Sequence, residues 1–195
     1  LPIRQLILAT NENDILSRFF NRGEYSLGQV SQTLSPSMDI QVASNFERYL
    51  YYLAGSDAKK LCGLMDEFAR TGALRVSVGA GGVVDPAFAA GVGSTREVLD
   101  TIRRYYQEYG YLLDPHTAVG VAVAEALGVG GDPVICLATA HPAKFPAAIE
   151  QATGKNLARH ADIDKLMELP TRCKILDNDK EAVRRFIIET LGERS

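Results

Sequence analysis

A short apolar stretch followed by a polar loop and a helical pattern is the feature that most constrains the fold of this chain. Residues 3–9 (IRQLILA) predict a strand, which the polar cluster at residues 10–14 (TNEND) ends. Large apolar residues then recur at helical spacing as far as Gly23, so a helix is expected there, with Asn13 or Asp14 as its cap. Strand, polar loop and helix form the unit from which parallel sheets are built, so we expect an α/β fold.

A second unit of the same kind lies in the C-terminal half of the sequence. Residues 117–127 (TAVGVAVAEAL) predict a helix of small residues, which allows close packing against a sheet. Residues 134–138 (VICLA) form a continuous apolar run, typical of a parallel strand that is buried on both faces. A loop and a helix that begins near Pro146 follow this strand. The predicted architecture is a three-layer αβα lobe with a mainly parallel sheet.

The other predicted elements lie between and beyond these two units. Helical patterns cover residues 45–53, 58–70, 94–110 and about 180–191, the last with Val183, Phe186, Ile187 and Leu191 facing inward. Ser94 and Glu97 are spaced as a capping box, which fixes the start of the third of these helices. Residues 24–38 and 76–93 are predicted to be loops, and residues 172–176 a late strand. With 195 residues and 46% hydrophobic side chains, the chain can form a single α/β lobe over residues 1–195.

Charge and hydropathy exclude some classes of partner. The net charge of −3 gives no electrostatic reason to expect binding to nucleic acid. The longest nearly apolar run, residues 117–127, contains Glu125 and is too short to cross a bilayer, so no membrane partner is expected.

The three cysteines lie far apart in the sequence and lack the spacing of metal ligands, so no metal site is expected. They are Cys62, Cys136 and Cys173, and we expect them to be reduced thiols in a cytoplasmic protein, with Cys136 buried. The sequence opens directly in a predicted strand, without an initiator methionine, which indicates a fragment of a longer protein.

Three polar clusters follow predicted strands or extended pieces, at the edge of the sheet where parallel α/β proteins bind their ligands. They are residues 10–14, 114–117 and 139–144. Each cluster also has a purely structural explanation, because polar loops provide solubility and Asn or Asp side chains cap helices without any ligand. The convergence of the three is therefore stronger evidence for a site than any one cluster.

Five motifs in these and neighbouring segments resemble the threonine synthases of bacteria and fungi. They occur in the order of that family, and the resemblance as a whole covers most of the chain: ATNENDIL (9–16), LSPSMDI (34–40), SNFERYLYYL (44–53), DPHTAVG (114–120) and ATAHPAKFP (138–146). DPHTAVG and TAHPAKF are the most specific, since tryptophan synthase β and cysteine synthase, which share the fold type of that family, carry other residues there.

This resemblance implies an enzyme of fold type II, similar to tryptophan synthase β, with pyridoxal 5'-phosphate bound between two lobes. Such enzymes are lyases of threonine biosynthesis that convert O-phospho-L-homoserine and water to L-threonine and phosphate. Two elements of the family do not appear in the sequence: the lysine that forms the Schiff base, expected in an N-terminal lobe, and a glycine-rich loop (SGNFG-like) for the cofactor phosphate, expected just before Leu1. The missing N-terminal lobe is thus an expected partner, and this part alone is expected to be inactive.

Thr139 and Asp114 are the residues that the resemblance places near the cofactor. The hydroxyl of Thr139 is expected to face the pyridine nitrogen, where a neutral group makes the ring a milder electron sink than a carboxylate would. The structural alternative for Thr139 is a cap on the following turn. Asp114 corresponds to an acidic position near the cofactor ring, but Asp before Pro is also a common start of a turn.

His141 and Lys144 follow Thr139 on a loop that could face the substrate, and a cationic side chain there would suit the substrate phosphate. Lys144 is equally explained as a solvated residue in a first helical turn. It is not expected to be the Schiff-base lysine, because nothing near it in the sequence explains its activation and the family places that lysine elsewhere.

Two other hypotheses remain open from the sequence. One is another fold type II activity, such as threonine dehydratase, against which DPHTAVG and TAHPAKF argue. The other is a non-catalytic binding module with a Rossmann-like sheet, which the missing lysine and phosphate loop favour. A glycine-rich loop immediately upstream of Leu1 would support the enzyme, and unrelated sequence there would support the module.

Overall fold

The computed structural model describes residues 2–79, 81–128 and 131–192 of the chain. The chain divides into two compact units, Leu1–His160 and Ala161–Ser195. The assignment of residues 1–195 to a single lobe stays a prediction. No helix within the described ranges is both long and apolar enough to cross a lipid bilayer.

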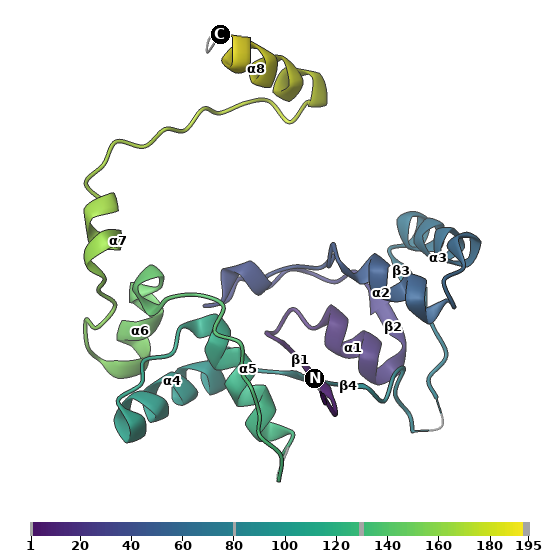
Figure 1. Ribbon diagram of the computed structural model, residues 1–195, viewed down its shortest axis with the longest axis horizontal. Helices are drawn as coiled ribbons and strands as arrows, with labels where there is room; N and C mark the ends of the chain where they lie inside the picture. Colours follow the sequence, from purple (N-terminus) through teal and green to yellow (C-terminus); the bar gives the residue numbers. More distant parts are fainter. Residues whose placement is uncertain (1, 80, 129–130, 193–195) are drawn as a thin grey trace. The chain divides into compact units, whose positions relative to one another are not determined.

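A parallel pair of strands lies at the centre of the first unit (Figure 1). β1 (Leu6–Thr10) pairs with β4 (Phe88–Val92), and Leu8 lies opposite Ala90 in the middle of the register. The expected first strand is therefore confirmed. The prediction of a loop over residues 76–93 is wrong for the part that forms β4.

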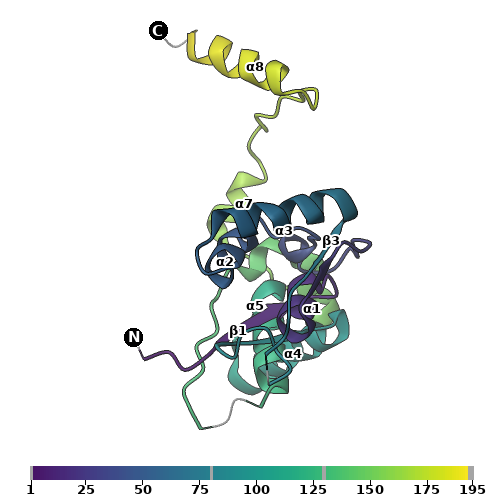
Figure 2. The same cartoon turned by 90° about the vertical axis from the view of Figure 1, so that its right-hand side faces the viewer.

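β4 lacks the usual sequence pattern of a strand because small residues replace β-branched ones. Gly91 leaves room for α5 (Pro115–Ala126), since a Cβ atom at this glycine would lie 2.8 Å from Cγ1 of Val123. A Cβ atom at Gly93 would lie 3.4 Å from Cγ1 of Val119, one turn earlier in the helix. α5 therefore packs on β1 and β4 and runs in the direction opposite to β4 (Figure 1 and Figure 2).

A short antiparallel pair lies beside α1 (Ile15–Arg22). It consists of β2 (Glu24–Ser26) and β3 (Ala73–Arg75). The prediction of a loop over residues 24–38 is thus wrong at its start, where tertiary pairing forms β2. The same segment ends in a 3-10 helix, η1 (Pro36–Met38).

The other helices of the first unit match the predicted ones closely. They are α2 (Phe46–Leu53), α3 (Ala58–Thr71), α4 (Thr95–Tyr109), α5 and α6 (Pro146–Thr153). The capping box of α4 forms as expected: the Ser94 hydroxyl accepts from the backbone N–H of Glu97, whose carboxylate accepts from the backbone N–H of Ser94 at 2.8 Å. Gly110 ends α4 in the left-handed conformation, with φ of 66°.

Two apolar clusters hold this unit together. One gathers the aromatic rings around α1, α2 and β2, where the rings of Tyr25 and Phe46 stack with centroids 4.2 Å apart. The other lies between α4, α5 and α6 and includes Ile102, Val119 and Ile149, each 0% exposed. Full burial of one such side chain is worth about 1.5–3 kcal/mol. This second cluster fixes α5, whose N-terminus carries residues predicted for the site.

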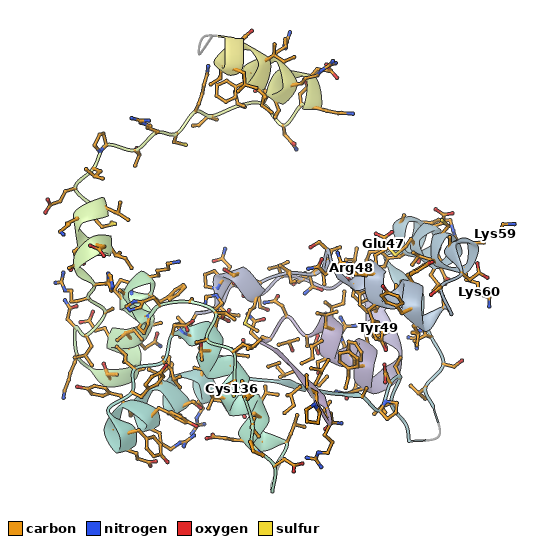
Figure 3. The ribbon with its side chains drawn as sticks, viewed as in Figure 1. Glu47, Arg48, Tyr49, Lys59, Lys60 and Cys136 are labelled. Carbon is orange, nitrogen blue, oxygen red and sulfur yellow. The ribbon has the colours of Figure 1, made fainter. Side chains whose placement is uncertain are left out.

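The expected buried strand at residues 134–138 is wrong for this structure. Val134, Ile135 and Leu137 are 45%, 85% and 77% exposed. Cys136, labelled in Figure 3, is predicted from the sequence to be buried, but it is exposed as well. Among the described residues, this segment pairs with no strand. A parallel strand forms only where a neighbouring strand supplies hydrogen-bond partners, which explains the difference.

The second unit contains α7 (Ala161–Leu166) and α8 (Lys180–Gly192). α8 confirms the last predicted helix, whereas residues 172–176 lack the expected strand for want of a neighbouring strand to pair with. Three residues of α8 that were to face inward are 41%, 50% and 62% exposed, because a unit this small offers no core to cover them: Val183, Ile187 and Leu191.

Candidate functional site

The N-terminus of α5 is built around the carboxylate of Asp114, which is 2% exposed. Its Oδ1 atom accepts hydrogen bonds from the backbone N–H groups of His116 at 2.9 Å and Thr117 at 3.4 Å. Pro115 occupies the first helical position, where no N–H group is needed. Asp114 therefore has the local structural role that the sequence allows for it, as the cap of a helix.

Further contacts engage the rest of this carboxylate. Oδ2 accepts a hydrogen bond from the hydroxyl of Thr117, and Oδ1 lies 3.2 Å from Nδ1 of His116. Nε2 of His116 accepts from the backbone N–H of Ser37 at 3.3 Å, so the ring proton sits on Nδ1 and points at Asp114. Both oxygens thus face donors of their own chain, and the contact of Asp114 with a cofactor ring stays a prediction.

Thr139 lies directly beside this helix cap. Its backbone N–H donates to Oγ1 of Thr117 at 3.3 Å. The residue follows the exposed segment 134–138 and is itself exposed. The structure thus brings together two of the three polar clusters, residues 114–117 and 139–144.

His141 and Lys144 lie at the two ends of a short turn, η2 (Pro142–Lys144), which His141 caps. Nδ1 of His141 accepts from the backbone N–H of Ala143 at 3.1 Å, so Nε2 carries the proton of the neutral ring. Both side chains are exposed and accessible to an anion. Their contact with a substrate phosphate stays a prediction.

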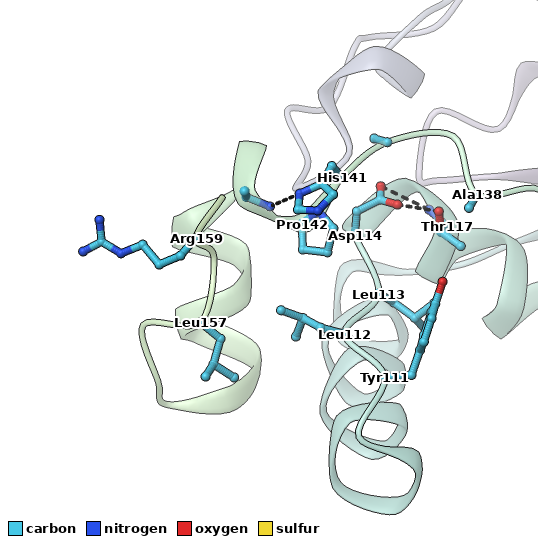
Figure 4. A pocket seen from close by; sticks show the side chains of 12 residues that line it. Tyr111, Leu112, Leu113, Asp114, Thr117, Ala138, His141, Pro142, Leu157 and Arg159 are labelled. Carbon is cyan, nitrogen blue, oxygen red and sulfur yellow. Dashed lines mark hydrogen bonds between the residues drawn. The ribbon is translucent and has the colours of Figure 1, made fainter. Parts of the chain in front are cut away.

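A cavity of about 310 Å³ opens beside the N-terminus of α5 (Figure 4). Apolar side chains form much of its wall, and polar or charged groups come from Asp114, Thr117, His141 and Arg159. Ala138 and Ala140 line the cavity, whereas Thr139 between them does not. A ligand that touches the Thr139 hydroxyl would therefore lie on another side of this segment, outside the cavity.

The third polar cluster has a different role. Asn11 and Asn13 are 1% and 3% exposed, and their amide groups bind the loop of residues 31–39. Nδ2 of Asn11 donates to Oδ1 of Asp39 at 2.7 Å, and Nδ2 of Asn13 donates to the same oxygen at 3.1 Å. Asp14 is the N-cap residue of α1, one of the two that the sequence predicts, but its side chain makes no capping hydrogen bond, and Asn13 is engaged with the loop.

Ser37 connects this loop to α5 through its bond to His116. Sequence reasoning missed Ser37, His116 and Asp39 as organising residues. The available signal was that LSPSMDI (34–40) and DPHTAVG (114–120) both belong to the family motifs, although they lie far apart in the chain. In the folded protein the two segments are in contact through the hydrogen bond between Ser37 and His116.

Comparison with known proteins assigns the chain to a family. Residues 117–187 match the family model described as threonine synthase, C-terminal. The chain is also 41% identical over 192 residues to the threonine synthase of Pseudomonas aeruginosa, an alignment that covers 96% of this chain and 40% of that protein. The chain belongs to the threonine synthase family. Threonine synthase-like 2 of Rattus norvegicus is similar too, at 36% identity over 201 residues, which cover 100% of this chain and 41% of that protein.

Solved structures of threonine synthases share the fold. The PLP-bound threonine synthase of Brucella melitensis matches with a TM-score of 0.86 at 42% identity, over 97% of this chain and 41% of that chain. Yeast threonine synthase matches with a TM-score of 0.83 at 35% identity, over 99% and 43%. The predicted α/β fold of the threonine synthase type is confirmed. The chain spans about two fifths of the length of these threonine synthases.

Proposed function

We propose that this chain is the C-terminal part of a threonine synthase, a lyase that uses pyridoxal 5'-phosphate to convert O-phospho-L-homoserine and water to L-threonine and phosphate. The observation that carries the proposal is the similarity to threonine synthases along nearly the whole chain, one of them with PLP bound. The rest of the protein would supply the Schiff-base lysine and the loop for the cofactor phosphate. The expected cytoplasmic location belongs to the same proposal.

Thr139 fits the contact with the pyridine nitrogen that we propose for it. The residue is exposed, so its hydroxyl is open to a ligand, while its backbone is held by Thr117. When bound, pyridoxal 5'-phosphate supplies an electron sink for the reacting carbon atoms. A neutral hydroxyl does not hold the ring nitrogen protonated as a carboxylate would, and this favours elimination and replacement over transamination.

His141 and Lys144 suit the phosphate of the substrate. Because Nδ1 of His141 accepts from the backbone N–H of Ala143, Nε2 is the donor of this ring. Lys144 adds an exposed ammonium group at the other end of the same turn. Charge-assisted hydrogen bonds from such groups bind phosphate oxygens strongly. The two residues would hold the phosphate while the substrate reacts and as the phosphate leaves.

The order of elements around α5 indicates where the rest of the protein joins the sheet. Because α5 runs opposite to β4, residues 132–139 return along it and run parallel to β1. β4, α5 and this segment therefore have the arrangement of a βαβ unit, whose second strand belongs in the same sheet.

Two contacts hold the ends of the returning segment. Arg4, just before β1, binds Asp132 at 2.8 Å, and Thr117 binds Thr139 at the far end. Residues 134–138 nevertheless form no ladder with β1. A single strand between β1 and this segment would place them two strand spacings, about 10 Å, apart. We infer that a strand of the missing N-terminal part inserts there, and that the isolated chain is inactive because the segment ending at Thr139 lacks this support.

The test is the release of phosphate and threonine from O-phospho-L-homoserine by the full-length protein, beside its Thr139→Val variant. The variant keeps the side-chain shape but removes the hydroxyl, and we expect kcat to fall roughly 100-fold, as for other single polar groups at a reacting centre. Thr71→Val is the matched control, because the Thr71 hydroxyl bonds only within α3 and the turn that follows, to Glu67 and Ala73. Its activity should stay within about twofold of the wild type.

A full-length protein that binds pyridoxal phosphate but releases no phosphate would overturn the proposal. It would favour another fold type II activity, such as that of threonine dehydratase. Substrate preference between O-phospho-L-homoserine and threonine distinguishes these two enzymes directly.

A further inference from the structure

The carboxylate of Asp114 makes more hydrogen bonds than a helix cap requires, and the extra ones fix which groups donate and which accept around it. Capping requires only one oxygen, and Oδ1 fulfils it by accepting from two backbone N–H groups. Oδ2 accepts the only proton of the Thr117 hydroxyl. Oγ1 of Thr117 can therefore act only as an acceptor towards other groups, and the backbone N–H of Thr139 uses it at 3.3 Å.

The same carboxylate begins a second chain of hydrogen bonds, which runs through His116 to Ser37. The Nδ1 proton points at Oδ1 of Asp114, 3.2 Å away, which leaves Nε2 as the acceptor for the backbone N–H of Ser37. The imidazole also packs on the ring of Phe145, with centroids 4.8 Å apart, and this contact helps to fix its plane. One buried charge thus determines the direction of two hydrogen bonds to separate loops.

We propose that Asp114 is a positioning residue whose carboxylate orders the loops at Thr139 and Ser37 around the N-terminus of α5. It acts on Thr139 through the hydroxyl of Thr117. The 2% exposure of Asp114 and the donors that face both of its oxygens support this role. The significance of Thr139 for catalysis rests on the proposed function, whereas the ordering of its backbone does not.

Asp114→Asn separates positioning from capping. Asn caps helices as well as Asp does, so α5 keeps its cap. The new NH₂ group, however, confronts the Thr117 hydroxyl with a donor, and that hydroxyl no longer presents Oγ1 to Thr139 in a fixed direction. Asp57→Asn is the matched control, because Asp57 caps α3 by accepting from two backbone N–H groups at 2.9 and 3.2 Å, far along the chain from this network.

The first measurement is amide hydrogen exchange in the full-length protein, which requires no activity. In Asp114→Asn, the amide of Thr139 should exchange at least about tenfold faster, since it loses an oriented acceptor, whereas the amide of Ser37 should keep its rate, because the retained side-chain oxygen still accepts from Nδ1 of His116. Asp57→Asn should leave both rates unchanged. The second measurement is steady-state kinetics, where Asp114→Asn should lower kcat roughly 10–100-fold and change KM far less, the size of effect that supporting groups around a site have.

Thr117 provides a second, independent pair of variants. Thr117→Val removes the hydroxyl and should match Asp114→Asn in the exchange rate of Thr139, whereas Thr117→Ser keeps the hydroxyl and should restore the slow rate. The double variant of Asp114→Asn and Thr117→Val should be no worse than Thr117→Val alone, because both changes break one chain of bonds.

Unchanged exchange at Thr139 in a folded Asp114→Asn variant would reduce Asp114 to a cap and refute the inference. If Asp114→Asn prevents folding, the Val and Ser variants of Thr117 decide by the same readout. A wild-type protein that makes no threonine would overturn the proposed function alone, because the exchange rates still test the positioning role.

Discussion

Replacing Asn11 with Asp probes the buried contact between β1 and the loop of residues 31–39. The two side chains have nearly the same shape, so the change is confined to one group, in which NH₂ becomes oxygen. In the wild type the two protons of this NH₂ are shared among three acceptors, Oδ1 of Asp39 at 2.7 Å and the hydroxyls of Thr33 at 2.8 Å and Ser35 at 3.0 Å. In N11D a second carboxyl oxygen faces Asp39 at a position that is 1% exposed.

Burial and the neighbouring carboxylate both raise the pKa of the introduced carboxyl group in the folded protein. At pH 7 the group is best accommodated in its protonated form, whose O–H can donate to Asp39 as the amide does. Protonation of a group with an unfolded pKa of about 3.9 costs about 1.4 kcal/mol per pH unit, so about 4 kcal/mol at pH 7 and about 1.5 kcal/mol at pH 5. Because the folded pKa is the raised one, the loss of stability is largest at high pH and disappears below the unfolded pKa.

Urea unfolding of the full-length protein between pH 5 and pH 7 measures this loss, with amide exchange in residues 31–39 as the local readout. Asn45→Asp is the matched control, because Asn45 is exposed and makes no side-chain capping bond to α2. Its effect should stay within about 0.5 kcal/mol. A loss in N11D that does not change with pH, or no loss at all, would refute the reasoning.

Three further changes, one of them with a control, test other parts of the fold. Ile149→Ala empties a fully buried position between α4, α5 and α6 and should lower the free energy of unfolding in urea by about 2–5 kcal/mol. Gly91→Ala places a Cβ atom 2.8 Å from a valine of α5 and should cost about 1–3 kcal/mol in the same assay, whereas Gly63→Ala in α3, which meets open space, should stabilise by up to about 1 kcal/mol. Hydrogen bonds from Ser94 lower the pKa of Glu97 from its ordinary 4.5. The Glu97 carboxylate therefore stabilises α4 fully at pH values above 4.5, and this contribution is lost as the pH falls through the lowered pKa of the folded state. Glu97→Gln should abolish this acid dependence, which unfolding curves between about pH 3 and pH 5 would reveal.

Helices with local signals follow from the sequence alone. α4 has a capping box at Ser94 and a glycine stop at Gly110, and both signals act within a few residues of the helix. β4 (Phe88–Val92) has no such signal, because its small residues suit α5 and it becomes a strand only through pairing with β1. Residues 134–138 show the opposite case, since they have the pattern of a buried strand without a paired neighbour in this part of the protein.

The candidate site likewise has residues that the sequence locates and contacts that only the structure reveals. The motifs locate Asp114 and Thr139, and the structure places one hydroxyl group, that of Thr117, between them. The sequence cannot reveal that Asn11 and Asn13 bind a distant loop, because the same amide groups serve equally well as helix caps. Contacts between segments that lie far apart in the chain have no local pattern, so structure is needed to find them.

The exposed, unpaired segment VICLA (134–138) affects how this part of the protein behaves when it is expressed separately. Five consecutive residues without charge or proline, with their backbone groups unpaired, form a template on which a second molecule can add a strand. During synthesis of a full-length threonine synthase, the N-terminal part is already present when this segment leaves the ribosome, so the segment meets its own sheet first. A piece expressed as residues 1–195 has only other copies of itself to pair with, and it should aggregate at concentrations at which the whole protein stays dispersed.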